Sequence, residues 1–256
     1  MRRTLRWIGW SIAALIVAAA VLVLGVLLFA NTPPGQTLIA RLAPRLTGGL
    51  VTMTGLSGRF PDRLRAAQLS LHDKDGIWAT VDDLDLDWYP LRLVTGDIAI
   101  HRIAATKIDV LRSPVSSGGS SSRLAIVIDA LHVGRMDIAA PVTGRATSLA
   151  LDGYGAITAT KQGHIVLVAK GIGAPGDYHL DARVGATDLD LRLSGQEPSH
   201  GLISKLAGLP DLGPLSIDGT FAGPRSAVAT KLGLAAGQLR ASAHGTVDLE
   251  HRKSVV

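Results

Sequence analysis

The 256-residue chain contains no cysteine and few aromatic residues. The absence of cysteine excludes disulfides, thiolate nucleophiles and cysteine-ligated zinc sites. The motifs of common catalytic chemistry are missing as well: the sequence has no HExxH zinc motif, no GxSxG nucleophile elbow and no Walker motif. We therefore expect a protein that is not an enzyme, with no catalytic residues, no cofactor and no metal site. For the same reason, the sequence offers no candidate catalytic triad for a membrane-anchored hydrolase.

Charge is also sparse, at 18% of residues against 47% hydrophobic residues. The hydrophobic content excludes a disordered chain. The net charge is +5. Three of the arginines of the chain, Arg2, Arg3 and Arg6, precede an apolar segment. The other basic residues are scattered, without a basic stripe and interleaved aromatic residues, which argues against nucleic-acid binding.

Residues 8–30 form one long run without a charge. At about 1.5 Å per residue, a helix of this length crosses a hydrocarbon core of about 30 Å. Trp7 and Trp10 lie at one end, where membrane-interface aromatic residues belong. The alternative is a cleaved signal peptide, but its apolar region spans only about 7–15 residues, and Leu28-Phe29-Ala30 is a poor cleavage site. The preceding arginines predict a single-pass inner-membrane protein with a cytoplasmic N-terminus and a periplasmic bulk, anchored by residues 1–31.

A short amphipathic helix is predicted at residues 33–46, within a segment of residues 32–48. Thr32 fits an N-cap, and Pro33 fits the first helical position. Apolar residues then recur at helical spacing, although Pro44 limits the regular helix. This helix either lies on the bilayer or plugs the end of a following sheet, and the sequence leaves both open.

From residue 49 onward, apolar and polar residues alternate with a period of two, as in Leu84, Leu86 and Trp88 with aspartates between them. Turn signals such as Asp75-Gly76 separate the runs. Short strands without helical crossovers predict antiparallel pairing throughout. Ser113–Ser122 is predicted to be a flexible loop between a sheet module at residues 49–112 and a second, truncated module at 123–256. Residues 199–208 are a candidate short helix with Ser199 as its N-cap.

Four short motifs follow the apolar segment: Gly55-Leu56-Ser57-Gly58, Asp75-Gly76-Ile77-Trp78, Leu86-Asp87-Trp88-Tyr89-Pro90 and Arg112-Ser113-Pro114. With the anchor, they make residues 32–112 resemble the N-terminal region of the TamB family, the AsmA-like inner-membrane subunits of the translocation and assembly module. The resemblance implies a long curled β-sheet with an open apolar groove, like a β-taco. It also implies phospholipid transport toward the outer membrane and a role in outer-membrane and autotransporter protein assembly and secretion. Family members engage an outer-membrane barrel protein through a C-terminal region that is absent here, so we expect a fragment or a truncated relative.

The groove hypothesis makes phospholipid acyl chains the ligand, because each buried methylene contributes about 0.8 kcal/mol. Periodicity alone favours the core of a closed β-sandwich, and only the resemblance favours an open groove. The alternative function is a protein-assembly scaffold or chaperone that acts through sheet edges without lipid transport. The predicted groove residues are Leu69, Leu71, Ile77, Val81, Leu84, Leu86, Ile98, Ile100, Ile108, Val110, Ile126 and Ile128.

Two further sequence patterns can be interpreted either as a ligand-binding site or as ordinary turns and solvated strands. Residues 171–176 fit the letters GxGxxG, but Pro175 and the strand pattern after it oppose a dinucleotide site, which needs the start of a helix there. The aspartates between residues 82 and 87 lack the glycine turn and the closing glutamate of an EF-hand. We interpret them as a solvated outer face that discourages aggregation between sheets.

Overall fold

The computed structural model describes residue 25 and residues 28–115, 125–199, 201–206, 210, 212–249 and 253–255. Most of the predicted anchor, with Trp7 and Trp10, and part of the predicted Ser/Gly loop lie outside these residues. Across the described ranges, no helix combines the length and the apolar character that a membrane crossing requires.

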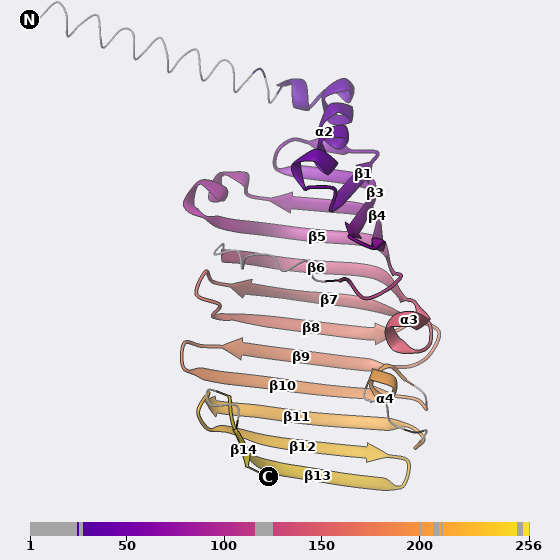
Figure 1. The fold of residues 1–256 in the computed structure, drawn as a ribbon, viewed down its shortest axis with the longest axis vertical. Coiled ribbons are helices and arrows are strands. Elements are labelled where there is room, and N and C mark those ends of the chain that lie inside the picture. The colour runs from indigo at the N-terminus through magenta and orange to yellow at the C-terminus, as the bar shows by residue number, and fades with distance from the viewer. Residues whose placement is uncertain are drawn as a thin grey trace, which may run out of the picture.

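The chain folds into a mainly β structure in which all strands belong to one open, mostly antiparallel sheet (Figure 1). Neighbouring strands follow the order of the chain, except that β2 lies off the path and pairs with β3, as β1 does. The strands are β1 (Val51–Thr54), β2 (Ser57–Arg59), β3 (Arg63–Asp73), β4 (Gly76–Trp88), β5 (Asp97–Val110), β6 (Ala125–Ile138), β7 (Thr147–Ile157), β8 (Gly163–Gly171), β9 (Asp177–Val184), β10 (Asp188–Glu197), β11 (Leu215–Pro224), β12 (Val228–Ala236), β13 (Leu239–Asp248) and β14 (Lys253–Val255). The helices are α2 (Pro33–Leu46), the 3-10 helix η1 (Pro90–Thr95), α3 (Ala140–Thr143) and α4 (Leu202–Leu206).

One strand pair departs from the antiparallel pattern. β5 and β6 pair in parallel, with Ile98 opposite Ile126 and Val110 opposite Ile138, so the prediction of antiparallel pairing throughout is wrong at this place. A parallel pair needs a connection of about a dozen residues or more to return the chain to its starting end, and residues 111–124 provide it. Strands of the two predicted modules are therefore hydrogen-bonded neighbours in one sheet.

The start of this connection is fastened to the hairpin between β3 and β4. Arg112 donates hydrogen bonds to Asp73 Oδ2 and to the Gly76 carbonyl, both at 2.8 Å, and the Val115 N–H donates to Asp73 Oδ2, also at 2.8 Å. The Asp73 side chain is only 5% exposed. The hydrogen bonds from Arg112 hold the pKa of Asp73 well below its usual range. Two of the sequence motifs therefore meet at this buried carboxylate.

The predicted amphipathic helix is confirmed as α2, with the predicted cap: Thr32 Oγ1 accepts a hydrogen bond from the Gly35 N–H at 3.3 Å. The helix contacts β1 at the N-terminal end of the sheet (Figure 1). Gln36 Nε2 donates to the Gly58 carbonyl at 3.2 Å, and Asn31 Nδ2 donates to the Phe60 carbonyl at 2.8 Å. α2 therefore lies at the end of the sheet, which is one of the two placements that the sequence left open.

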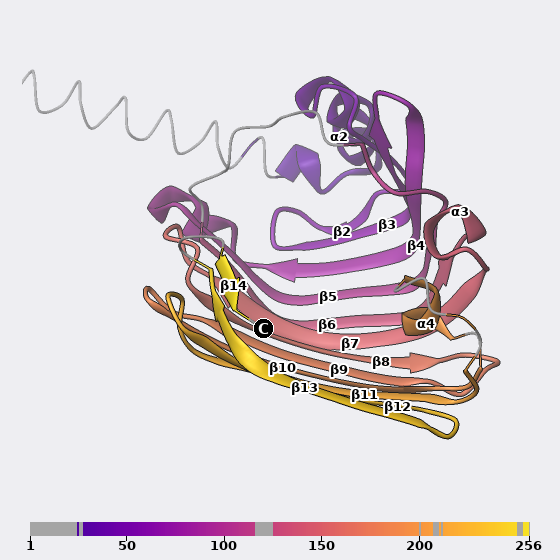
Figure 2. The same cartoon turned by 60° about the horizontal axis from the view of Figure 1, so that its bottom comes forward.

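The sheet curls along its strands (Figure 2). Pairs of polar or small residues interrupt the period-two pattern in neighbouring strands: Asp82-Asp83 in β4, Thr106-Lys107 in β5 and Gly134-Arg135 in β6. These interruptions align, because Asp82 pairs with Lys107 and Lys107 pairs with Arg135. Asp83 takes a left-handed backbone conformation, with φ of 51°. Each interruption shifts the phase of the alternation, so the apolar residues before and after it stay on one face.

Candidate functional site

Strand register shows which side chains share a face, because directly opposed residues lie on the same side of a sheet. One continuous row of register partners crosses the sheet from β3 to β13, and every member is apolar or glycine. Its members are Leu64, Leu86, Ile103, Leu131, Gly153, Leu167, Leu180, Leu193, Gly219, Leu232 and Ala243.

Two more rows flank this one, and polar groups are almost absent from them. The first consists of Trp88, Ile100, Ile128, Gly155, Ile165, Ala182, Leu191, Phe221, Thr230 and Gly245. The second consists of Ala105, Val133, Leu151, Ala169, Tyr178, Gly195, Ile217, Leu234 and Ala241. We call the surface formed by the three rows the apolar face.

The opposite side of the sheet carries charged pairs, and we call it the polar face. Arg65 pairs with Asp85 at 3.0 Å, and Arg63 pairs with Asp87 at 3.4 Å. Further along the sheet, His132 Nδ1 lies 2.7 Å from Asp152 Oδ1, and His164 Nε2 lies 2.8 Å from Asp181 Oδ1. Such exposed pairs add little stability. They agree with the interpretation of the aspartates of β4 as part of a solvated outer face.

The apolar face lies on the inner side of the curl. α4 sits on the concave side of the sheet (Figure 2), and its Ile203 side chain packs over Gly195, which belongs to one of the apolar rows. A β-carbon at Gly195 would collide with Ile203 Cδ1 and would approach Ile217 Cγ2 to 3.3 Å. Glycine at this position therefore allows the helix to rest directly on the apolar face.

A buried carboxylate holds α4 in place. Glu197, which is 5% exposed, accepts hydrogen bonds from the N–H groups of Ile203 and Ser204, both at 2.7 Å, from Ser204 Oγ at 2.6 Å and from the Tyr178 hydroxyl at 3.0 Å. Burial and the nearby Glu197 carboxylate raise the pKa of Tyr178 well above its usual value. The predicted short helix is present, but the predicted cap, Ser199, is wrong, because the side chain of Glu197 binds the first amides of α4.

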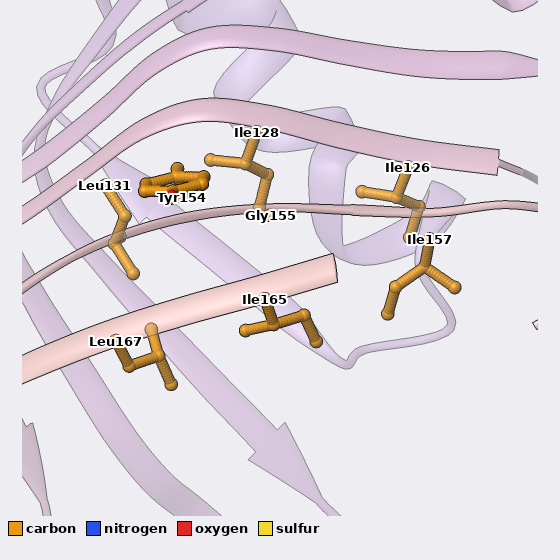
Figure 3. A pocket seen from close by; sticks show the side chains of 8 residues that line it. All are labelled: Ile126, Ile128, Leu131, Tyr154, Gly155, Ile157, Ile165 and Leu167. Carbon is orange, nitrogen blue, oxygen red and sulfur yellow. The ribbon is translucent and has the colours of Figure 1, made fainter. Parts of the chain in front are cut away.

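The apolar face contains a hollow of about 120 Å³, which is open to solvent on one side and lined almost entirely by apolar atoms. Figure 3 shows side chains of β6 and β8 on either side of Gly155 in β7. Gly153 and Gly155 face Leu131 and Ile128 of β6 in the register, and Leu167 and Ile165 of β8. Because Gly155 adds no side chain, it leaves a gap between the branched residues of the neighbouring strands. Over Gly153 the Leu167 side chain occupies the corresponding space, since a β-carbon there would lie 2.6 Å from Leu167 Cδ2. The lining residues are Ile126, Ile128, Leu131, Tyr154, Gly155, Ile157, Ile165 and Leu167.

The structure brings together nearly all of the predicted groove residues. Ile98, Ile126 and Ile157 follow one another in the register, as do Leu69, Val81 and Ile108. Apolar register partners also flank Leu71, Leu84, Leu86, Ile100, Val110 and Ile128.

Ile77 is the exception among the predicted groove residues. It lies beyond a register shift in the hairpin between β3 and β4, its partner is His72, and it is 42% exposed. Ile77 therefore lies at the margin of the apolar face.

Sequence reasoning missed Gly155 in the hollow and the lining residues Leu131, Tyr154, Ile157, Ile165 and Leu167. Leu131 follows Asp129-Ala130, a pair that breaks the alternation, so a period-two search passes over it. Ile165 and Leu167 lie in the continuous apolar run of residues 165–169, which indicates a strand but does not show which side chains share a face. Gly153 and Gly155 read as turn residues until the register places them on the apolar face.

The GxGxxG-like sequence pattern takes the ordinary interpretation. The GxGxxG-like segment, residues 171–176, joins β8 to β9 as a turn, so a strand rather than a helix follows it. Within the described parts of the chain, no group of His, Asp and Glu side chains is arranged to hold a metal ion.

Comparisons of the chain with models of protein families, with curated proteins and with solved structures found no match.

Proposed function

We propose that this protein is a conduit for phospholipid acyl chains, held at the inner membrane by its N-terminal segment, and that it carries lipid toward the outer membrane in support of outer-membrane and autotransporter protein assembly. The observation behind the proposal is the apolar face, which continues from β3 to β13 on the concave side of a single sheet. The described strands all belong to this sheet, so none of them forms a second sheet that seals the rows. The resemblance to the TamB family supplies the direction of transport.

The energetics suit sliding rather than tight capture. Each methylene that leaves water gains about 0.8 kcal/mol. Leucine or isoleucine side chains recur on the apolar face in every strand from β3 to β12, and β13 adds Ala241 and Ala243. Strands lie about 4.8 Å apart, so the row from Leu64 to Ala243 forms an apolar path on the order of 50 Å long. A path of nearly equal steps holds an acyl chain without a deep trap.

Two neighbouring residues of β8 provide a matched test. Leu167 lines the hollow, whereas Val168 lies on the polar face, opposite Asp152 of β7 and His179 of β9. We expect Leu167→Lys to abolish the phospholipid that copurifies with the full chain, as measured by mass spectrometry, and Val168→Lys to leave it in place. Equal lipid loading in both variants and in the wild type contradicts the conduit.

A second candidate function rests on the edge of β13. In the described part of the chain, β14 pairs only with Thr246, Val247 and Asp248, so residues 239–245 of β13 pair on one side alone, with β12. An unpaired edge can accept an incoming strand, as strand-addition chaperones do. Photo-crosslinkers at Ala241 should then trap nascent outer-membrane proteins in lipid-free samples. If capture requires lipid or fails there, assembly through this edge is excluded.

A further inference from the structure

The 3-10 helix η1 exposes a dense set of large apolar side chains. Leu91 is 84% exposed, Val94 87%, Leu93 44% and the preceding Tyr89 52%. Single exposed leucines are ordinary on protein surfaces, but four such residues in one short turn form a patch of the kind that binds a partner or a membrane. We call these four residues the η1 patch.

The turn that carries the patch is well defined. Thr95 Oγ1 donates to the Arg92 carbonyl at 2.8 Å, and the Gly96 N–H donates to the Leu93 carbonyl at 3.1 Å. Gly96 ends the helix in the left-handed conformation, with φ of 83°. The apolar side chains are therefore presented on a hydrogen-bonded turn, and their exposure is a fixed property of the fold.

The patch adjoins the mouth of the hollow. The N–H of Ala125, at the start of β6, donates to the Gly96 carbonyl at 3.4 Å. The strand ends beside it place Ile98, Ile126 and Ile157 in one register line, and Ile126 and Ile157 line the hollow. Apolar surface thus continues from η1 into the concave face.

The position and chemistry of the patch select a bilayer as its partner. In Figures 1 and 2 the turn between β4 and β5, which carries η1, lies at the strand ends in the N-terminal part of the sheet, on the side opposite α2. Leu28 and Phe29, at the end of the predicted anchor, are 63% and 49% exposed. The only charged residue of η1 is Arg92, which is exposed and complements anionic headgroups. A tyrosine, branched apolar residues and an arginine together are typical of interfacial segments.

We propose that η1 inserts into the surface of the membrane that holds the anchor and is the point at which acyl chains pass from the bilayer into the hollow. This rests on the proposed function for the identity of the cargo. Contact between η1 and lipid can nevertheless be measured without any lipid transport.

The chain has no cysteine, so single cysteines can report the depth of chosen sites. The full chain is reconstituted into vesicles of phosphatidylethanolamine and phosphatidylglycerol, with a polarity-sensitive dye on Val94→Cys. The matched control is Ala159→Cys, in the exposed turn after β7 at the same edge of the sheet. We expect a blue-shifted emission and quenching by spin-labelled lipid at residue 94, and water-like emission at residue 159. Water-like emission at both sites overturns the proposal, and it is the result that a protein partner for η1 would give.

Variants of the patch separate this proposal from the conduit. Leu91 and Val94 are exposed, so Leu91→Ser/Val94→Ser leaves the fold intact; we expect it to reduce phospholipid loading of the full chain several-fold. Dye burial on Val94→Cys, together with a wild-type chain that never carries phospholipid, upholds the bilayer contact and refutes the conduit. Phospholipid loading with a water-exposed η1, or loading unchanged by the double variant, upholds the conduit and refutes entry at η1.

Discussion

Replacing Glu197 by alanine should loosen α4 from the apolar face, so stability and ligand binding should change in opposite directions. Glu197 accepts four hydrogen bonds, at 2.6–3.0 Å, from Tyr178, Ile203 and Ser204. The main contacts of α4 are with β10 and α3, and Ile203 is the side chain that it places on Gly195. Without the carboxylate, the first amides of α4 lose their acceptor and the helix has little left to hold it.

The magnitude follows from these contacts. A hydrogen bond to a charged group contributes about 1.5–3 kcal/mol net. The full sum is an upper limit, because the hydroxyls of Tyr178 and Ser204 reach water once α4 moves away. We therefore expect Glu197→Ala to lower the free energy of unfolding by about 3 kcal/mol. For a chain of this size that corresponds to a decrease in Tm of about 6–12 °C.

Urea unfolding measures the loss of stability. Binding of a polarity-sensitive apolar dye measures the gain in accessible apolar surface. Gln196→Ala is the control, because Gln196 is exposed and adjoins Glu197 on β10. Tyr178 adds a spectroscopic readout: its raised pKa should fall toward the ordinary tyrosine value in Glu197→Ala, so that its phenolate forms at lower pH. Unchanged stability would refute the role of Glu197. Lower stability without more dye binding would show that α4 covers no usable apolar surface.

The remaining predictions concern the hairpin between β3 and β4 and its neighbours. Because the folded pKa of Asp73 is depressed, its contribution to stability is present above the unfolded value of about 3.9 and is lost as pH falls toward the folded value. Asp73→Asn should therefore unfold more easily at pH 7 and show a weaker acid dependence below pH 4, as followed by urea titration at several pH values. Trp88 Nε1 donates to the Pro61 carbonyl at 2.6 Å, so Trp88→Phe should cost about 1 kcal/mol in chemical denaturation; no change would indicate that water replaces the bond. Leu86→Glu and Ile100→Glu, on neighbouring rows of the apolar face, should each eliminate copurifying phospholipid, and lipid that persists in both would contradict the groove assignment.

Local signals in the sequence were sufficient for much of the fold. Thr32 and Pro33 marked the start of α2, because an N-cap hydroxyl and a proline at the first helical position need only local geometry. The alternating runs of β4, β5 and β10 indicated strands with one apolar side, because a strand turns successive side chains to opposite faces. These features depend on a few neighbouring residues and on no distant contact.

Features that depend on distant partners could not be predicted in the same way. The parallel pairing of β5 with β6 depends on where the connection after Val110 returns to the sheet, and the loop composition alone does not say. Glu197 reads as the polar end of a strand until Tyr178, in the neighbouring strand, and Ser204, in a later helix, surround it. Gly155 becomes the floor of a hollow only through its register with Ile128 and Ile165.

The polar doublets are visible in the sequence, but their effect on the sheet depends on the neighbouring strands. A strict period of two would send Val81 and Leu84 to opposite faces, since three positions separate them. In the structure the doublet Asp82-Asp83 lies beside Lys107 of β5, and Lys107 lies beside Arg135 of β6, so neighbouring strands change phase at the same level. Across β4, β5 and β6 the matched changes preserve the apolar rows and leave the charged residues on the polar face. β7 makes no such change, and register shifts in its pairing with β6, between Ile128 and Leu131 and between Val133 and Met136, keep the rows continuous there. The continuity of the apolar face, on which the proposed conduit depends, is therefore a property of the aligned strands and not of any single alternating run.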